Sequence, residues 1–108
     1  MADKLLRVRV VSPDRIVFDG EGTAVVAPAW DGQLGILPGH APMLALVGSG
    51  VLSIERAGGG SDAFHVAGGV LKVERNQVTV LTEYAGETPP PKPLPDTVVY
   101  PEDAAALA

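Results

Sequence analysis

The sequence predicts an all-β domain followed by a proline-rich C-terminal tail. From Leu5 to Leu81 the apolar residues recur with a period of two, in short runs separated by Gly, Pro, Asn and Asp. Two pairs of neighbouring runs also fit the registers of antiparallel hairpins. Hydrophobic residues make up 46% of the 108 residues but aromatic ones only 5%, so small aliphatic side chains must fill the core. Several such strands make a sandwich or a barrel.

The opening strands alternate cleanly. In residues 5–10, Leu6, Val8 and Val10 share one face of a predicted strand. A second strand is predicted for residues 16–18, and a third for residues 23–27, after a break at Gly20-Glu21-Gly22.

The stretch from Trp30 to Leu44 is predicted to be one rigid loop that serves as a recognition surface. Glycine can adopt positive φ, whereas proline fixes φ and removes a backbone donor. Pro38-Gly39 suits the two central positions of a type II turn, which would then present His40. The residues expected to shape this loop are Gly32, Gly35, Pro38, Gly39 and Pro42.

Two side chains of this stretch have alternative interpretations. Trp30 is the only tryptophan of the chain, and it could cap its own domain or form the centre of an interface. His40 could contact a partner or stabilise the loop through a hydrogen bond to the backbone.

The first predicted hairpin lies between residues 51 and 66. Its apolar faces pair Ile54 with Phe64, which centres the turn on Gly59 and sets Arg56 opposite Asp62. A favourable charge pair in the register of the apolar face supports this pairing.

A second hairpin is predicted directly afterwards. It pairs Val73 with Val78 and leaves Arg75-Asn76 as a two-residue turn, where Asn accepts positive φ. Gly68-Gly69 separates the two hairpins and is expected to mark a bend where two backbones approach closely.

The alternating pattern ends after Tyr84. Residues 1–86 are therefore assigned to the β domain and residues 87–108 to a tail. Pro89 to Pro95 should be extended, as a spacer or a docked strap, with at most one short helical turn near the end.

Composition and motifs argue against nucleic-acid binding, metal binding and catalysis. A net charge of −5 makes nucleic acid an improbable partner, and the absence of cysteine excludes thiolate catalysis. The two histidines have no metal-ligand spacing, and no phosphate-binding loop or acid, base and nucleophile set is present. We therefore expect no catalytic residues, metal or cofactor. No apolar run reaches the roughly 20 residues that a membrane helix requires.

Residues 31–44 closely resemble the signature loop of the epsilon subunit of F-type ATP synthases. Residues 48–54, 66–73 and 76–81 resemble later strands of that family in the same order. The resemblance spans about residues 4–86 and implies a flattened β-sandwich of about ten mostly antiparallel strands.

The same resemblance implies a non-catalytic rotor subunit of the central stalk. Such a subunit links the gamma subunit to the c-ring and couples ion translocation to ATP synthesis, peripheral to the cytoplasmic face of the bacterial plasma membrane. Trp30, Asp31 and Gln33 would face the c-ring and His40 would lie near gamma. Relatives often carry Glu at the position of Gln33, so Asp31 would supply the charge. No homo-oligomer is expected.

Relatives commonly end in a helical hairpin that inhibits ATP hydrolysis. Too few residues follow the proline run for two such helices, so coupling without hairpin inhibition is expected. The alternative is a free-standing β-sandwich module that recognises a protein or saccharide through residues 30–42.

Overall fold

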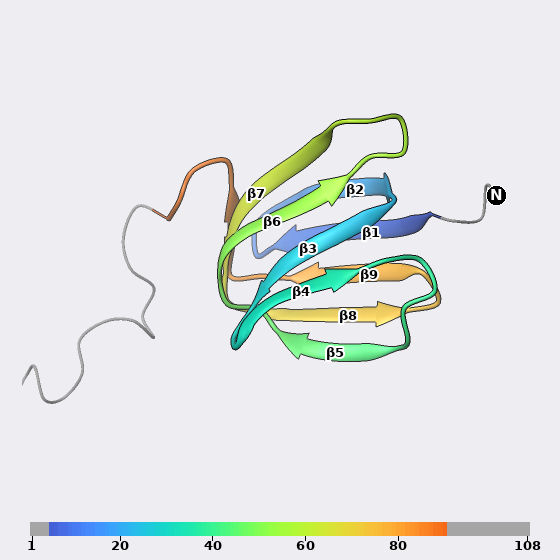
Figure 1. Cartoon of the computed structure of the whole chain (residues 1–108). Helices are drawn as coiled ribbons and strands as arrows, with labels where there is room; N and C mark the ends of the chain where they lie inside the picture. The colour runs from blue at the N-terminus through green and yellow to red at the C-terminus, as the bar shows by residue number, and fades with distance from the viewer. Residues whose placement is uncertain (1–4, 91–108) are drawn as a thin grey trace, which may run out of the picture.

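Two five-stranded sheets pack face to face in the computed structural model, which describes residues 5–90 (Figure 1). Sheet A has the order β2-β1-β9-β8-β5 and sheet B the order β10-β7-β6-β3-β4. Only β1 and β9 run parallel among the paired strands of this part of the chain. The bounds are β1 Leu6–Ser12, β2 Arg15–Gly22, β3 Ala24–Ala29, β4 Gly32–Ile36, β5 Met43–Leu46, β6 Ser49–Glu55, β7 Ser61–Ala67, β8 Val70–Glu74, β9 Gln77–Leu81 and β10 Tyr84–Gly86.

The predicted fold class is confirmed: ten mostly antiparallel strands form a sandwich. Predictions for the tail from residue 91 onward fall on residues outside the described range. They include most of the proline run, the terminal helical turn and the expected lack of a helical hairpin.

The core is filled by aliphatic side chains on the inner faces of both sheets. In β1, Leu6, Val8 and Val10 are buried while Arg7 and Arg9 are exposed, as the alternation predicts. Phe18 and Phe64 lie at the border of this core, where their rings meet edge to face at 6.1 Å. The buried cluster consists of Leu6, Val8, Val10, Val25, Ala27, Ile36, Val47, Leu52, Ile54, Val66, Leu71, Val73, Val78, Val80 and Ala85.

The predicted break at residues 20–22 is wrong, because β2 continues to Gly22. The glycine has a packing role instead. A Cβ on Gly22 would lie 2.7 Å from the Glu55 carbonyl oxygen and 2.8 Å from the Ile54 side chain. Gly22 therefore allows β2 to pass close to β6 in the opposite sheet.

The register predicted for the β6–β7 hairpin is also wrong. Leu52, not Ile54, pairs with Phe64, and the loop centres on Gly58. The Arg56 amide donates to the Gly60 carbonyl at 2.9 Å, which closes a three-residue loop, and inside it the Gly59 amide donates to the Arg56 carbonyl at 3.1 Å. Three consecutive glycines permit more than one centre, so the sequence could not choose between them. Arg56 and Asp62 still form an ion pair at 3.6 Å, now diagonally.

The β8–β9 hairpin is confirmed residue by residue. Val73 pairs with Val78, and Arg75 and Asn76 have φ of 51° and 62°, as a type I′ turn requires.

The chain crosses between the sheets at Gly68-Gly69 and again at Thr82. Gly69 has φ of 111°, and a Cβ there would overlap the Leu81 carbonyl oxygen and lie 2.6 Å from the Thr82 Cα. The predicted close approach is thus confirmed. The chain then forms β10 beside β7, a strand that was not predicted from the sequence. Three residues are too few for alternation to reveal a strand.

Candidate partner-binding surface

Trp30 and Asp31 form the turn between β3 and β4, where the backbone doubles back at one end of the sandwich. Trp30 is 71% exposed, so it does not cap its own domain. Its amide donates to the Leu46 carbonyl at 3.2 Å, which fixes the turn beside β5. Asp31 and Gln33 are exposed next to it, and these residues line an open groove of about 470 Å³ between β4 and β5.

The Pro38-Gly39 turn is confirmed as type II. Gly39 has φ of 90°, and the His40 amide donates to the Leu37 carbonyl at 3.0 Å. The Gly39 amide also donates to Asn76 Oδ1 at 2.7 Å, which ties this turn to the β8–β9 hairpin. His40 is half-buried, and its Nδ1 donates to the Ala41 carbonyl at 2.7 Å. Within the chain, His40 thus stabilises its own loop.

The interpretation of residues 30–44 as one loop is wrong, because β4 and the start of β5 occupy much of it. Trp30 and Asp31 precede β4 and the Pro38-Gly39 turn follows it, so the two groups lie at opposite ends of the strand (Figure 1). Gln33 lies within β4, and Pro42 directly precedes β5. Gly32 has φ of 139°, but Gly35 lies inside β4 without a positive φ.

An apolar row that the sequence did not reveal crosses the outer face of sheet A. The register places one outward side chain from each strand side by side. Leu46 is 58% exposed, Leu81 54% and Ile16 55%. A bulge between Val10 and Val11 brings Ile16 onto this face. The members, in the order β5, β8, β9, β1, β2, are Leu46, Val70, Leu81, Val11 and Ile16, hereafter the apolar row.

Charged side chains lie beside the apolar row on the same face. Asp19 accepts hydrogen bonds from Arg7 at 3.0 Å and from Arg9 at 3.1 Å. Loss of hydration raises the pKa of Asp19, but the hydrogen bonds and charges of Arg9 and Arg7 outweigh it, so the pKa lies below its usual value. Lys72 pairs with Glu74 at 3.3 Å further along the face. The face therefore combines the apolar row with flanking ion pairs, a combination typical of protein interfaces.

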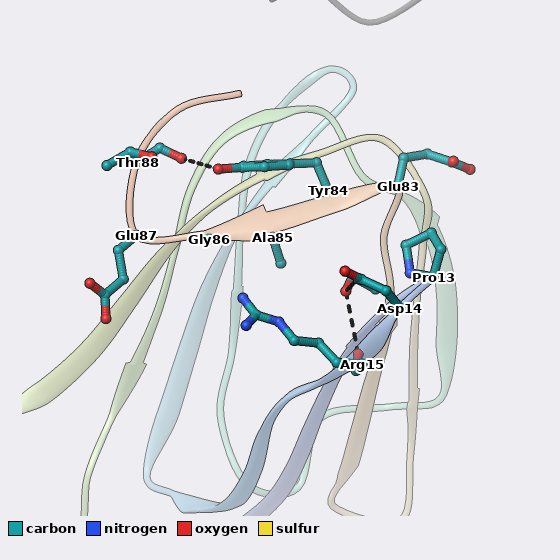
Figure 2. Close-up of a pocket in the computed structure, with 10 residues that line it drawn as sticks. Pro13, Asp14, Arg15, Glu83, Tyr84, Ala85, Gly86, Glu87 and Thr88 are labelled. Atoms are coloured by element: carbon teal, nitrogen blue, oxygen red, sulfur yellow. Dashed lines mark hydrogen bonds between the residues drawn. The ribbon is translucent and has the colours of Figure 1, made fainter. Parts of the chain in front are cut away.

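A second cleft lies between the start of β2 and β10, on the side of the sandwich opposite the groove between β4 and β5. It encloses about 890 Å³, and Figure 2 shows Arg15 extending toward β10 while Tyr84 reaches Thr88. The Tyr84 hydroxyl donates to the Thr88 carbonyl at 2.6 Å. Ser12 donates to Asp14 at 2.8 Å, and this bond holds the pKa of Asp14 below its usual value. No histidine lines this cleft to act as the base that a serine nucleophile requires.

Within residues 5–90 no group of three His, Cys, Asp or Glu side chains gathers that could hold a metal ion. The same residues contain no helix long and apolar enough to cross a membrane.

The comparisons with known protein families and with curated proteins both point to ATP synthase chains. A family described as "ATP synthase, Delta/Epsilon chain, beta-sandwich domain" matches residues 5–88. An ATP synthase epsilon chain of Synechococcus sp. (strain JA-2-3B'a(2-13)) is 50% identical over 80 residues, which cover 74% of this chain and 58% of that protein. One from Bordetella petrii is 45% identical over 80 residues, with 74% and 57% covered. The match thus spans less than two-thirds of these curated relatives.

Two solved structures share the fold. A chain of the Euglena gracilis mitochondrial ATP synthase (OSCP/F1/c-ring) superposes with a TM-score of 0.72 and 21% identity, covering 97% of this chain and 62% of that one. A chain of the Tetrahymena thermophila mitochondrial ATP synthase central stalk and c-ring gives a TM-score of 0.64 and 18% identity, covering 76% and 66%. At these identities the likeness concerns the fold.

Proposed function

The chain belongs to the ATP synthase delta/epsilon family of β-sandwich domains, and we propose that it acts as the epsilon-type rotor subunit of an F-type ATP synthase. In this role it binds the gamma subunit and rests on the c-ring, and it couples ion translocation to ATP synthesis without performing catalysis. The family match over residues 5–88 is the observation that carries the proposal.

The outer face of sheet A is proposed to bind gamma. The apolar row crosses five strands, and three of its members, Leu46, Leu81 and Ile16, are about half exposed, so it loses water contact when a partner covers it. The flanking Arg7, Arg9 and Lys72 fix the orientation of the partner through polar contacts at the rim. His40 and its loop extend this contact at one end of the sandwich.

The opposite end, at Trp30, Asp31 and Gln33, is proposed to contact the c-ring. Trp30 supplies an exposed aromatic anchor and Asp31 a charge at the tip of a tight turn. Two partners at two ends of one rigid sandwich suit a subunit that transmits torque.

The proposed location is peripheral to the membrane, on the cytoplasmic face of the bacterial plasma membrane, held there through the complex. We also propose that residues 1–86 form the sandwich domain and that residues 87–108 form a separate tail. A free-standing module for a protein or saccharide ligand is not favoured, because the family match covers the whole sandwich.

Co-purification tests the proposal. The tagged full chain should bring down gamma and the c-ring from the cells that produce it, and a chain that brings down neither would refute the proposed role. ATP synthesis by membrane vesicles should fall when the chain is removed and recover when it is added back.

A further inference from the structure

The free edge of β4 carries two unused pairs of backbone groups. β4 is the last strand of sheet B, and Gln33 pairs there with Pro28 of β3. The Pro28 carbonyl accepts a hydrogen bond from the Gly48 amide at 2.8 Å, so the backbone of Pro28 faces away from β4. Because hydrogen-bonded and non-hydrogen-bonded pairs alternate along an antiparallel ladder, the N–H and C=O of Gln33 point to the open edge.

The same alternation turns Gly35 outward. Gly35 lies two residues beyond Gln33 and pairs with Val26, so its N–H and C=O face the same edge. No hydrogen bond recorded within residues 5–90 lies on that edge at either residue. Two outward residues at this spacing match the ladder of an incoming strand.

Gly35 has no role in the fold itself. It has no positive φ, and a Cβ there would meet no atom within 4 Å. Glycine inside a strand weakens it, and it is common where another backbone approaches closely. A close approach from outside the chain is therefore the physical explanation for a glycine here.

The two long sides of the sandwich differ in charge. On one side, β2 carries Arg15, Asp19 and Glu21, and charged side chains on an edge strand oppose pairing with another chain. On the other side, neither β4 nor β5 contains a charged residue. β10, the other edge strand of sheet B, is also uncharged but has only three residues, and a very short edge strand offers little to pair with. The edge of β4 is thus the longer uncharged edge of sheet B.

We infer that an extended segment of the gamma subunit pairs with the free edge of β4 and adds a sixth strand to sheet B. This inference rests on the proposed function. Gamma fits because β4 runs from the Trp30 turn to the His40 loop, and the proposed partner of the His40 loop is gamma. The net charge of −5 of this chain favours a segment that carries cations. A second copy is disfavoured because each chain carries a net charge of −5.

Amide hydrogen exchange of the full chain, free and bound to gamma, tests this directly. In the free chain the amides of Gln33 and Gly35 should exchange at least about tenfold faster than those of Leu34 and Ile36. Binding of gamma should slow Gln33 and Gly35 by at least about tenfold.

The outcomes separate the inference from the proposed function. A stable complex with unchanged exchange at Gln33 and Gly35 overturns the inference alone, whereas failure to bind gamma overturns both. The assignment to gamma is overturned if exchange at Gln33 and Gly35 slows only when the c-ring is present. It is also overturned if exchange slows as the concentration of the free chain rises.

A proline at position 35 supplies the second measurement. Gly35→Pro removes the outward N–H, whereas Gly35→Ala keeps it. Both variants should fold, because proline is tolerated where an edge N–H faces solvent. Gly35→Pro should bind gamma about tenfold more weakly than Gly35→Ala. Equal affinities, or unfolding of the proline variant alone, would contradict the outward geometry.

Discussion

Replacing two leucines of the apolar row should weaken gamma binding while leaving the fold intact. Full burial of a leucine side chain contributes about 1.5–3 kcal/mol. Leu46 is 58% and Leu81 54% exposed in the free chain, so roughly half of that contribution is available to a partner at each position. The double variant Leu46→Ser, Leu81→Ser should therefore lose about 1.5–3 kcal/mol of binding free energy, or ~10- to 150-fold in affinity.

Isothermal titration of gamma with the full chain measures this loss, and thermal unfolding of each variant checks the fold. Val51→Ser is the matched control, because Val51 is 44% exposed but projects from the outer face of sheet B. Its affinity should equal that of the unmodified chain. Tight binding by the double variant, or an equal loss in the control, would show that the apolar row is not the contact surface.

Three further predictions concern the scaffold. Gly69→Ala should lower the free energy of unfolding, measured in urea, by at least about 3 kcal/mol, because the added Cβ would overlap the backbone of Leu81 and Thr82. Gly58→Ala is the control: its Cβ would lie in open space, so the free energy of unfolding should stay nearly unchanged. Thr82→Val should cost about 1–3 kcal/mol by the same assay, since its hydroxyl lies 2.7 Å from the Gly68 carbonyl; Thr82→Ser should retain most of the stability, and equal losses would argue against that bond. Because the pKa of Asp19 is lowered on folding, its stabilising contribution is present above its ordinary pKa of 3.8 and is lost as pH falls through the lowered value. Asp19→Asn should therefore reduce the difference in melting temperature between neutral and acidic pH; an unchanged difference would contradict the pairing with Arg9.

Local sequence patterns predicted the fold class because a strand with one buried face has alternating apolar and polar residues. Side chains alternate faces with a period of two, so Leu6, Val8 and Val10 identify the inner face of β1 without any tertiary information. The β8–β9 register followed from a turn short enough to fix it, with Asn76 at a position of positive φ. The same logic failed for β6–β7, where three glycines make several turn centres equally possible.

The candidate site was predicted only in part, for a related reason. Pro38-Gly39 specified its own turn, and the sequence marked Trp30, Asp31, Gln33 and His40 as residues of interest. It did not separate them, because the glycines around β4 concealed a strand within a segment that reads as a loop. The roles of these four residues in partner contact stay predictions.

The sequence by itself determined that this chain forms a β-sandwich, which of its aliphatic side chains face inward, and to which family its central segment is similar. The tertiary structure decided how strands distant in sequence align. The parallel pairing of Val11 with Leu81 and the bulge that turns Ile16 outward have no local signal, because they depend on how five strands pack together. The apolar row and the open edge of β4 are products of that alignment, and they exist only in the folded chain.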